Sequence, residues 1–306
     1  MEGLHRRPER VAVSYLGESH GQSLIRIEER TAVTRLGWCY GMRGSPVYDG
    51  EGRLAGYLDS RYGKIHGSTI AGCARLEDCD DDASPGSGRL PPGLQDLPRM
   101  GLAMPVVPGT SVERLQVWGD MRIGVRGSVI RVNGDLVLCG FETDRTLGTG
   151  VEVRALAVAP PRAIGWAYFE PSRECVSGAV VGAVLQDEQG VAVGVLGMEP
   201  PSIELRVRAV PPAGPAVSRT MRVAQRSMAV PKLVGLLTRV ITGHADGNRP
   251  GHATVRIETS NGVREWASVE AESSIALSAG TLVEQALAGI EDEWPKAVEI
   301  IVDLTE

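Results

Sequence analysis

The feature that most constrains the fold of this chain is a run of short, β-branched segments punctuated by glycine between residues 106 and 210. The segments are ERLQVWGD, RGSVIRV, GDLVLCGF, GVEVRALAV, SGAVVGAVLQ, GVAVGVLG and SIELRVRAV. Two of them are joined by V-N-G-D, which is typical of a tight β-hairpin turn. Because short apolar runs separated by turn residues are typical of barrels and sandwiches, we expect a mainly β protein.

The composition agrees with this expectation and excludes some classes of function. Of 306 residues, 42% are hydrophobic but only 4% are aromatic, while glycine (38) and proline (19) are plentiful. This balance favours strands and tight turns over a helical bundle. The formal charge is -6 and the basic residues are scattered, which argues against a nucleic-acid partner.

The sequence gives no sign of a cofactor or a metal. Neither a dinucleotide-binding glycine motif nor a phosphate-binding loop is present. The five cysteines include no C-x-x-C pair, and we expect them to be small buried hydrophobic residues. They are Cys39, Cys73, Cys79, Cys139 and Cys175.

Changes in composition divide the chain into four expected parts. We predict a first β lobe over residues 1–76, a polar and mobile linker over 77–105, and a second β lobe over 106–210. Residues 211–306 are expected to form a small α+β module. Within that module we predict a helix over residues 218–243, interrupted at Pro231. We also predict a hairpin around Asn261 and Gly262, an amphipathic helix over 278–294 and a final strand over 297–304.

A turn in the first lobe carries a chemical motif. The stretch CYGMRGSPVYDGEGRLAGYL, residues 39–58, predicts a turn bracketed by glycines, then a strand, a D-G-E-G turn and a returning strand. A serine nucleophile needs such a turn to expose its hydroxyl, together with nearby N–H donors and a base within hydrogen-bond reach. The residue between the two glycines, however, is Arg43 rather than serine.

The motif resembles that of the SpoIVB-type serine peptidases and their SpoIVB-domain relatives. These proteins carry G-M-S-G-S-P-[VI]-Y, and GMRGSPVY at residues 41–48 departs from that pattern only at Arg43. The stretch WGDMRIGVRGSVIRVNGDLVLCGFETD, residues 118–144, resembles the family's block that ends in Phe-Gly-His. Together with the flanking strands, the resemblance spans roughly residues 11–210. It implies a two-lobed, β-barrel-like core of the serine-peptidase type, with the C-terminal α+β module added to it.

The resemblance also identifies the positions that a peptidase of this family would use. Arg43 stands at the nucleophile position and Glu142 at the position of the histidine base, with Gly140 and Phe141 transposed. Glu28 lies near the position of the family's aspartate. An arginine cannot form an acyl-enzyme, so no catalytic residue is assigned. Arg43 and Glu142 are expected either to form an ion pair that replaces the dyad or to be two unrelated surface charges.

The first hypothesis is therefore a catalytically inactive, SpoIVB-like pseudopeptidase that binds an extended peptide or a protein partner. Its candidate cleft comprises Met42, Arg43, Gly44, Ser45 and Glu142. A second hypothesis is an active serine hydrolase that uses displaced residues, namely Ser45 or Ser177 with His20. A third is a purely structural module of a larger assembly, in which residues 77–99 fill the groove.

The sequence supports few statements about location. The N-terminal MEGLHRRPERVAVSYLG lacks the apolar run of a signal peptide, and no stretch has the length of a membrane-spanning helix. As written, the chain is expected to be cytoplasmic, whereas a start site further upstream would permit export to the cell envelope. The oligomeric state stays open.

Overall fold

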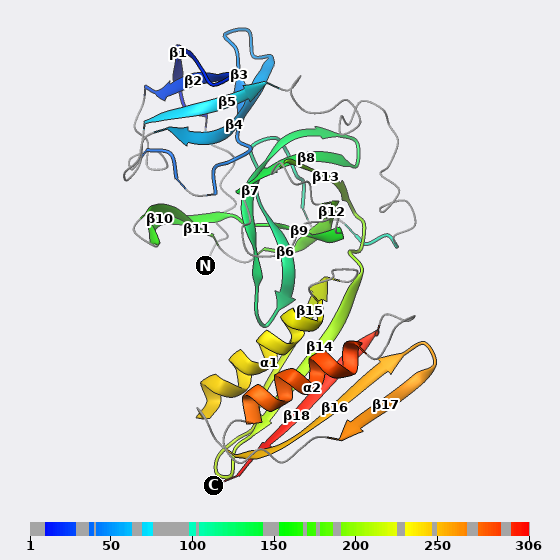
Figure 1. Cartoon of the computed structure of the whole chain (residues 1–306). Helices are drawn as coiled ribbons and strands as arrows, with labels where there is room; N and C mark the ends of the chain where they lie inside the picture. Colours follow the sequence, from blue (N-terminus) through cyan, green and yellow to red (C-terminus); the bar gives the residue numbers. More distant parts are fainter. Residues whose placement is uncertain are drawn as a thin grey trace. The chain divides into compact units, whose positions relative to one another are not determined.

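The computed structural model describes the chain in fourteen stretches. They are residues 10–28, 37–39, 41–62, 69–75, 98–101, 104–142, 153–167, 170–175, 178–185, 191–224, 230–246, 250–267, 275–288 and 295–305. These stretches contain 18 strands and two helices (Figure 1). The mainly β character that we expected from the sequence is thereby confirmed.

The chain forms two compact units. The first contains Met1–Leu115 and Gly124–Pro200, and the second contains Gln116–Ile123 and Pro201–Glu306. The strands that lie wholly in the first unit are β1 (Val13–Ser19), β2 (Gln22–Ile27), β3 (Pro46–Tyr48), β4 (Leu54–Tyr62), β5 (Ile70–Arg75), β8 (Leu136–Phe141), β9 (Val153–Val158), β10 (Pro161–Ala167), β11 (Glu170–Cys175), β12 (Val180–Leu185) and β13 (Val191–Leu196). The hairpin of β6 (Ser111–Gly119) and β7 (Ile123–Asn133) contributes its tip to the second unit.

The N-terminal strands of the first unit form a five-stranded antiparallel sheet in the order β1-β2-β5-β4-β3. β1 and β2 are joined by a tight turn in which His20 and Gly21 both have positive φ angles, of 51° and 77°, as a type I′ hairpin turn requires. Although β1 and β3 are the two edges, Val13 from β1 and Val47 from β3 pack against the same buried cluster. The sheet is therefore strongly curled.

The remaining large element of the first unit is a closed barrel of six strands. Its strands follow the order β6-β7-β8-β13-β12-β9, and pairing of β9 with β6 closes the circle. Alternate residues of β8, namely Val137, Cys139 and Phe141, belong to one buried cluster with Val112 of β6. This closed barrel agrees with the expected barrel-like core.

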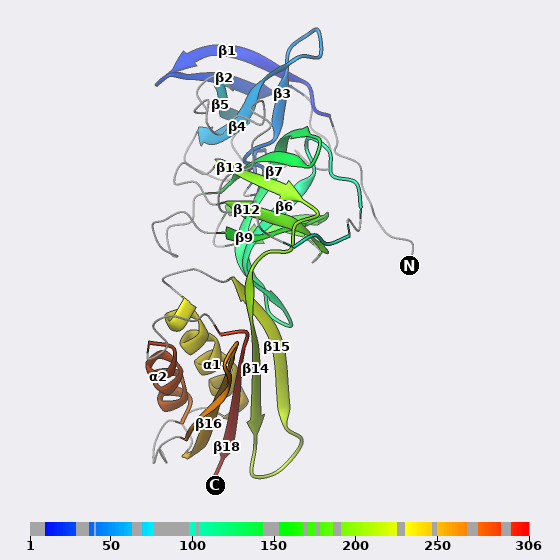
Figure 2. The ribbon, with the colours of Figure 1, turned by 90° about the vertical axis from the view of Figure 1, so that its right-hand side faces the viewer.

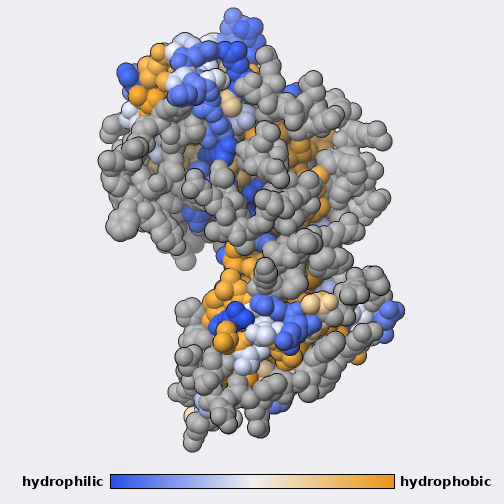
Figure 3. Space-filling model, in the orientation of Figure 1, coloured by the Kyte–Doolittle hydropathy of each residue, from blue (hydrophilic) through white to orange (hydrophobic). Residues whose placement is uncertain are grey.

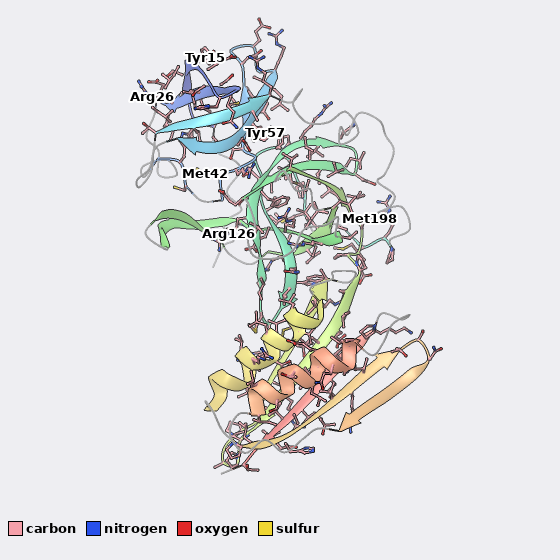
Figure 4. All side chains as sticks on the ribbon, viewed as in Figure 1. Tyr15, Arg26, Met42, Tyr57, Arg126 and Met198 are labelled. Atoms are coloured by element: carbon pink, nitrogen blue, oxygen red, sulfur yellow. The ribbon has the colours of Figure 1, made fainter. Side chains whose placement is uncertain are left out.

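The curled sheet and the barrel share a second buried cluster. Tyr57 of β4 and Ala74 of β5 pack with Ile130, Leu138 and Val191 from the barrel strands. Leu138 and Phe141 thus serve different cores, because side chains alternate between the two faces of β8. Figure 4 labels Tyr57, whose ring is only 6% exposed in this contact.

The second unit is a mixed sheet with two helices on one face. Its strands β17 (Gly262–Ala267), β16 (Gly251–Thr259), β18 (Ala297–Leu304), β14 (Ser202–Val210) and β15 (Val217–Ala224) are neighbours in that order. Helices α1 (Val230–Asp246) and α2 (Ile275–Ala288) cover one side of it (Figure 2). They approach closely, because a Cβ on Gly235 would lie 2.9 Å from the carbonyl oxygen of Gly280.

The first half of the expected helix over residues 218–243 is wrong. Residues 217–224 form β15, in which Met221 and Val223 are buried and Arg222 between them is exposed. That two-residue period is the pattern of a half-buried strand. The helix begins only at Val230, and Pro231 falls in its first turn, where a missing N–H is tolerated, rather than interrupting it.

The hairpin around Asn261 and Gly262 and the final strand lie where we expected them, as β16–β17 and β18.

The division into parts also differs from the expected boundaries. We expected residues 202–210 in the second β lobe, but this strand pairs in parallel with β18 and antiparallel with β15, so the second unit begins at Pro201. The described end of the expected mobile linker is attached to the barrel. There, Arg99 pairs with Met198, and the Met100 N–H donates to Gly197 O at 2.7 Å. Residues 76–97 lie outside the described stretches.

Among the described residues, neither helix combines the length and the apolar character that a membrane span requires.

Candidate functional site

The G-M-R-G-S motif folds into two successive tight turns. The Met42 N–H donates to the carbonyl of Cys39 at 3.2 Å, and the Ser45 N–H donates to the carbonyl of Met42 at 3.0 Å. Gly41 and Gly44 occupy the third positions of these turns, with φ angles of 91° and 82°. A type II turn requires positive φ at that position, so both glycines of the motif are dictated by the backbone.

Gly44 has a second role, because the turn lies directly on the barrel. A Cβ on Gly44 would lie 2.6 Å from the Cα of Gly140 and from the carbonyl oxygen of Ser128. A Cβ on Gly140 would likewise lie 2.5 Å from the Cα of Gly44. Two glycines from distant parts of the chain therefore permit main chain to pack against main chain.

Arg43, at the nucleophile position, forms an ion pair with Asp59 on β4. Its Nε donates to Asp59 Oδ1 at 3.0 Å, and a terminal guanidinium nitrogen contacts the same oxygen. Gln22 Nε2 donates to the other carboxylate oxygen of Asp59. The two charged side chains are only 14% and 20% exposed. Charged groups this far from solvent are stabilised mainly by each other, so the pair fixes the direction of the Arg43 side chain.

Glu142, at the base position, contacts the same turn. Its Oε1 accepts a hydrogen bond from the Gly41 N–H at 2.8 Å, and its own N–H donates to the Arg126 carbonyl at 2.9 Å. The structure thus brings the two sequence positions 41–45 and 142 together. The acidic partner that it gives Arg43 is Asp59; an Arg43–Glu142 ion pair stays a prediction.

Ser45 has no histidine beside it among the described residues. Its hydroxyl donates to the Met42 carbonyl at 2.7 Å and lies 3.4 Å from the Ser128 hydroxyl. His20 is an exposed residue of the β1–β2 turn, and Ser177 lies outside the described stretches. The displaced Ser–His pair of the second hypothesis therefore has no counterpart at Ser45.

The N–H groups of the turn are largely engaged. The Gly41 N–H donates to Glu142 Oε1, and the Met42 N–H donates to the Cys39 carbonyl. The Gly44 N–H donates to the Leu58 carbonyl, and the Ser45 N–H donates to the Met42 carbonyl. An oxyanion hole needs N–H groups that are available to a substrate oxygen. In this conformation these four N–H groups are not available to a substrate oxygen.

Two of the predicted site residues lie elsewhere. Met42 is only 2% exposed and belongs to the core of the curled sheet with Trp38 and Leu58, so it does not line a cleft. Glu28 accepts a hydrogen bond from the Ser14 hydroxyl at the paired ends of β1 and β2. Arg43 forms its ion pair with Asp59 instead.

The buried cysteines are not reactive candidates. Cys39, Cys73 and Cys139 are free thiols and buried, as we expected. Burial raises the pKa of the Cys73 thiol to about 11 and raises that of Cys139 as well. A thiol with a raised pKa stays protonated near neutral pH and is a poor nucleophile. Within the described residues, no group of three or more histidine, cysteine or acidic side chains is arranged to hold a metal ion.

The sequence reasoning missed Asp59, although the hairpin contained a signal for it. Pro46 pairs with Tyr57 and Val47 with Gly56, and the same register places residue 59 opposite residue 44. The β3–β4 turn that sets this register is organised by Asp49, whose Oδ1 accepts the N–H groups of Glu51 and Arg53 at 2.9 Å. The pKa of Asp49 is lowered, first by the hydrogen bond from the Arg53 N–H and second by the hydrogen bond from the Arg53 side chain.

Comparisons with known proteins give no family for the chain. No protein-family model matches it, and no curated protein sequence does. Among solved structures, exotoxin 6 from Staphylococcus aureus subsp. aureus Mu50 is 10% identical, with 64% of this chain and 93% of that chain covered and a TM-score of 0.21. Staphylococcal Superantigen-Like protein 4 is 11% identical, with 71% and 100% covered and a TM-score of 0.20. Likenesses of this size carry no inference about function.

Proposed function

We propose that this protein is a catalytically inactive homologue of the SpoIVB-type serine peptidases, and that it binds an extended peptide or a protein segment beside the turn at residues 41–45. The observation that carries the proposal is the hydrogen bond from the Gly41 N–H to Glu142. It supports the proposal because the two positions that the family resemblance pairs, Arg43 and Glu142, then belong to one turn and its contact.

The replacement of both groups supports binding without cleavage. A peptidase of this type needs a nucleophile and a base, and loss of either lowers turnover by on the order of a millionfold. Arg43 instead offers a guanidinium that is held in place by Asp59 and is 14% exposed. A fixed guanidinium is suited to binding carboxylate or carbonyl oxygens of a peptide.

The neighbouring strand supports an extended ligand. β3 follows the turn directly and is an edge of its sheet, paired only with β4 among the described residues. An edge strand offers main-chain donors and acceptors to an added peptide strand. The groove itself is part of the proposal.

The test is to pass a mixed peptide library over the immobilised protein and to identify retained and cleaved peptides by mass spectrometry. We expect retention of a subset without cleavage, and at least about tenfold weaker retention by Arg43→Ala, the loss that follows when a charged hydrogen-bond donor is removed. The matched control is Arg53→Ala, which removes a 72% exposed arginine from the same hairpin and leaves retention unchanged.

Two results would overturn the proposal. One is cleavage of library peptides by the unmodified protein, which would favour the hydrolase hypothesis. The other is the absence of retained peptides at any concentration, which would favour a structural module.

A further inference from the structure

The sheet of the second unit has one covered face and one open face. Ile203, Leu205 and Val207 of β14 are buried in the cluster that includes residues of α1 and α2. The residues that alternate with them point to the other side, which no described helix covers (Figure 2). We call that side the open face.

The open face is charged, and its charges are segregated. On β14 and β15 it carries Glu204, Arg206, Arg208 and Arg222, three basic groups and one acidic group, for a net charge of +2. On β16 and β18 it carries Arg256, Glu258, Glu299 and Asp303, three acidic groups and one basic group, for a net charge of -2.

The helix side differs, since Leu236 and Leu277 are 51% and 54% exposed there and hydrophobic residues appear on that side (Figure 3).

Part of this charge is neutralised within the unit and part is not. Arg206 pairs with Glu204 at 2.6 Å, and Arg256 lies 3.6 Å from Glu299. Arg208 on the basic half has no ion-pair partner in the described chain. The same holds for Glu258 and Asp303 on the acidic half, as far as the structure describes them.

The middle of the open face is less polar. The central strand β18 contributes Ile301, which is half-buried between Thr254 of β16 and Arg208 of β14. A partly apolar centre with a charged surround is the usual arrangement of a protein interface.

We propose that the open face binds the open face of a second copy of this chain. A two-fold axis parallel to the strands would place the basic half of each copy over the acidic half of the other. A surface with +2 on one side and -2 on the other is complementary to itself under that rotation, as a two-fold interface requires.

The area is sufficient for a dimer of modest affinity. Five strands spaced about 4.8 Å apart and about eight residues long present a face of about 600 Å² per copy. Two such faces bury about 1,200 Å² together, which is the lower end of the range for specific interfaces.

The test uses two charge-reversal variants of the full chain. Arg206→Glu with Arg208→Glu makes both halves acidic, and Glu258→Lys with Asp303→Lys makes both halves basic. We expect sedimentation equilibrium to show a dimer for the unmodified protein, with a Kd that rises at least about tenfold between about 50 mM and 500 mM salt. Each variant alone is expected to be a monomer, and an equimolar mixture is expected to form a 1:1 heterodimer.

A matched control separates this interface from a general effect of charge. Arg53→Glu with Arg75→Glu makes the same two Arg→Glu changes in the first unit as Arg206→Glu with Arg208→Glu makes on the open face. The altered side chains are 72% and 56% exposed, and this control is expected to leave the dimer intact. Circular dichroism verifies that each variant is folded. An unmodified protein that stays monomeric at low salt overturns the proposal, as does a dimer that survives both reversals or a mixture of variants that fails to associate.

Discussion

At the scale of single residues, the site is defined by how two charged side chains are held at the turn of residues 41–45. Arg43 is fixed by Asp59, and Glu142 is fixed by the Gly41 N–H. Both charged groups therefore serve to hold the turn. The function proposed for the site is recognition by a guanidinium of fixed direction.

The strength of the Arg43–Asp59 pair can be measured with a double-mutant cycle of Arg43→Ala and Asp59→Ala. Because the side chains are only 14% and 20% exposed, we expect a coupling energy of about 1–2 kcal/mol in urea unfolding. The control cycle uses Arg53 and Glu51, which are 72% and 71% exposed and should couple by less than about 0.5 kcal/mol. Equal coupling in the two cycles would show that the Arg43 pair does not stabilise the turn.

The sequence predicts some of these residues better than others. The glycines of the motif follow from the turn alone, because positive φ is a local property of the backbone. The motif indicates Glu142 and Glu28 as the acidic partners, whereas Asp59 follows only from the hairpin register, which places residue 59 beside the turn. The burial of Met42 depends on packing with Trp38 and Leu58, which no local pattern reveals.

At the scale of elements, the defining contact is the one between the turn and strand β8. The transposed order Gly140-Phe141 now has a physical reason. Phe141 points into the barrel core, where it is fully buried, and the neighbouring position therefore points outward to the turn. Only a glycine there allows the turn to approach, since a Cβ would meet Gly44 at 2.5 Å.

Gly140→Ala tests this contact without introducing backbone strain, since Gly140 is not among the glycines of positive φ. We expect the free energy of unfolding to fall by about 1–3 kcal/mol, the usual effect of overpacking. Gly50→Ala is the matched control, because a Cβ there meets nothing within 4 Å, and it should change stability by less than about 0.5 kcal/mol. If Gly140→Ala is as stable as Gly50→Ala, the turn does not rest on β8 in solution.

Element type was predictable where the apolar period was clear, and it failed where two signals competed. The seven segments between residues 106 and 210 all fall on strands, six in the barrel and the seventh on β14 of the second unit, and V-N-G-D joins β7 to β8. Residues 218–224 were expected at the start of a helix, whereas their pairing with β14 makes them a strand with a period of two residues.

At the scale of the whole molecule, the two units have separate cores, and each is built from two separate stretches of chain. β14 pairs in parallel with β18, and the tip of the β6–β7 hairpin pairs with β15. Such long-range pairings have no signature in a local pattern. For this reason the C-terminal part was expected to begin at residue 211, whereas the corresponding stretch of the second unit begins at Pro201. The proposed dimer face exists only because β14 and β15 join β16 and β18 in one sheet.

The central claim, an inactive peptidase homologue, is tested most directly by treating the native protein with a fluorophosphonate that labels reactive serines and measuring its intact mass. A serine peptidase treated in parallel serves as the positive control. The account predicts an unchanged mass, because Arg43 replaces the nucleophile and the hydroxyl of Ser45 donates to the Met42 carbonyl. A stoichiometric phosphonate adduct on Ser45, or on any other serine, would contradict it.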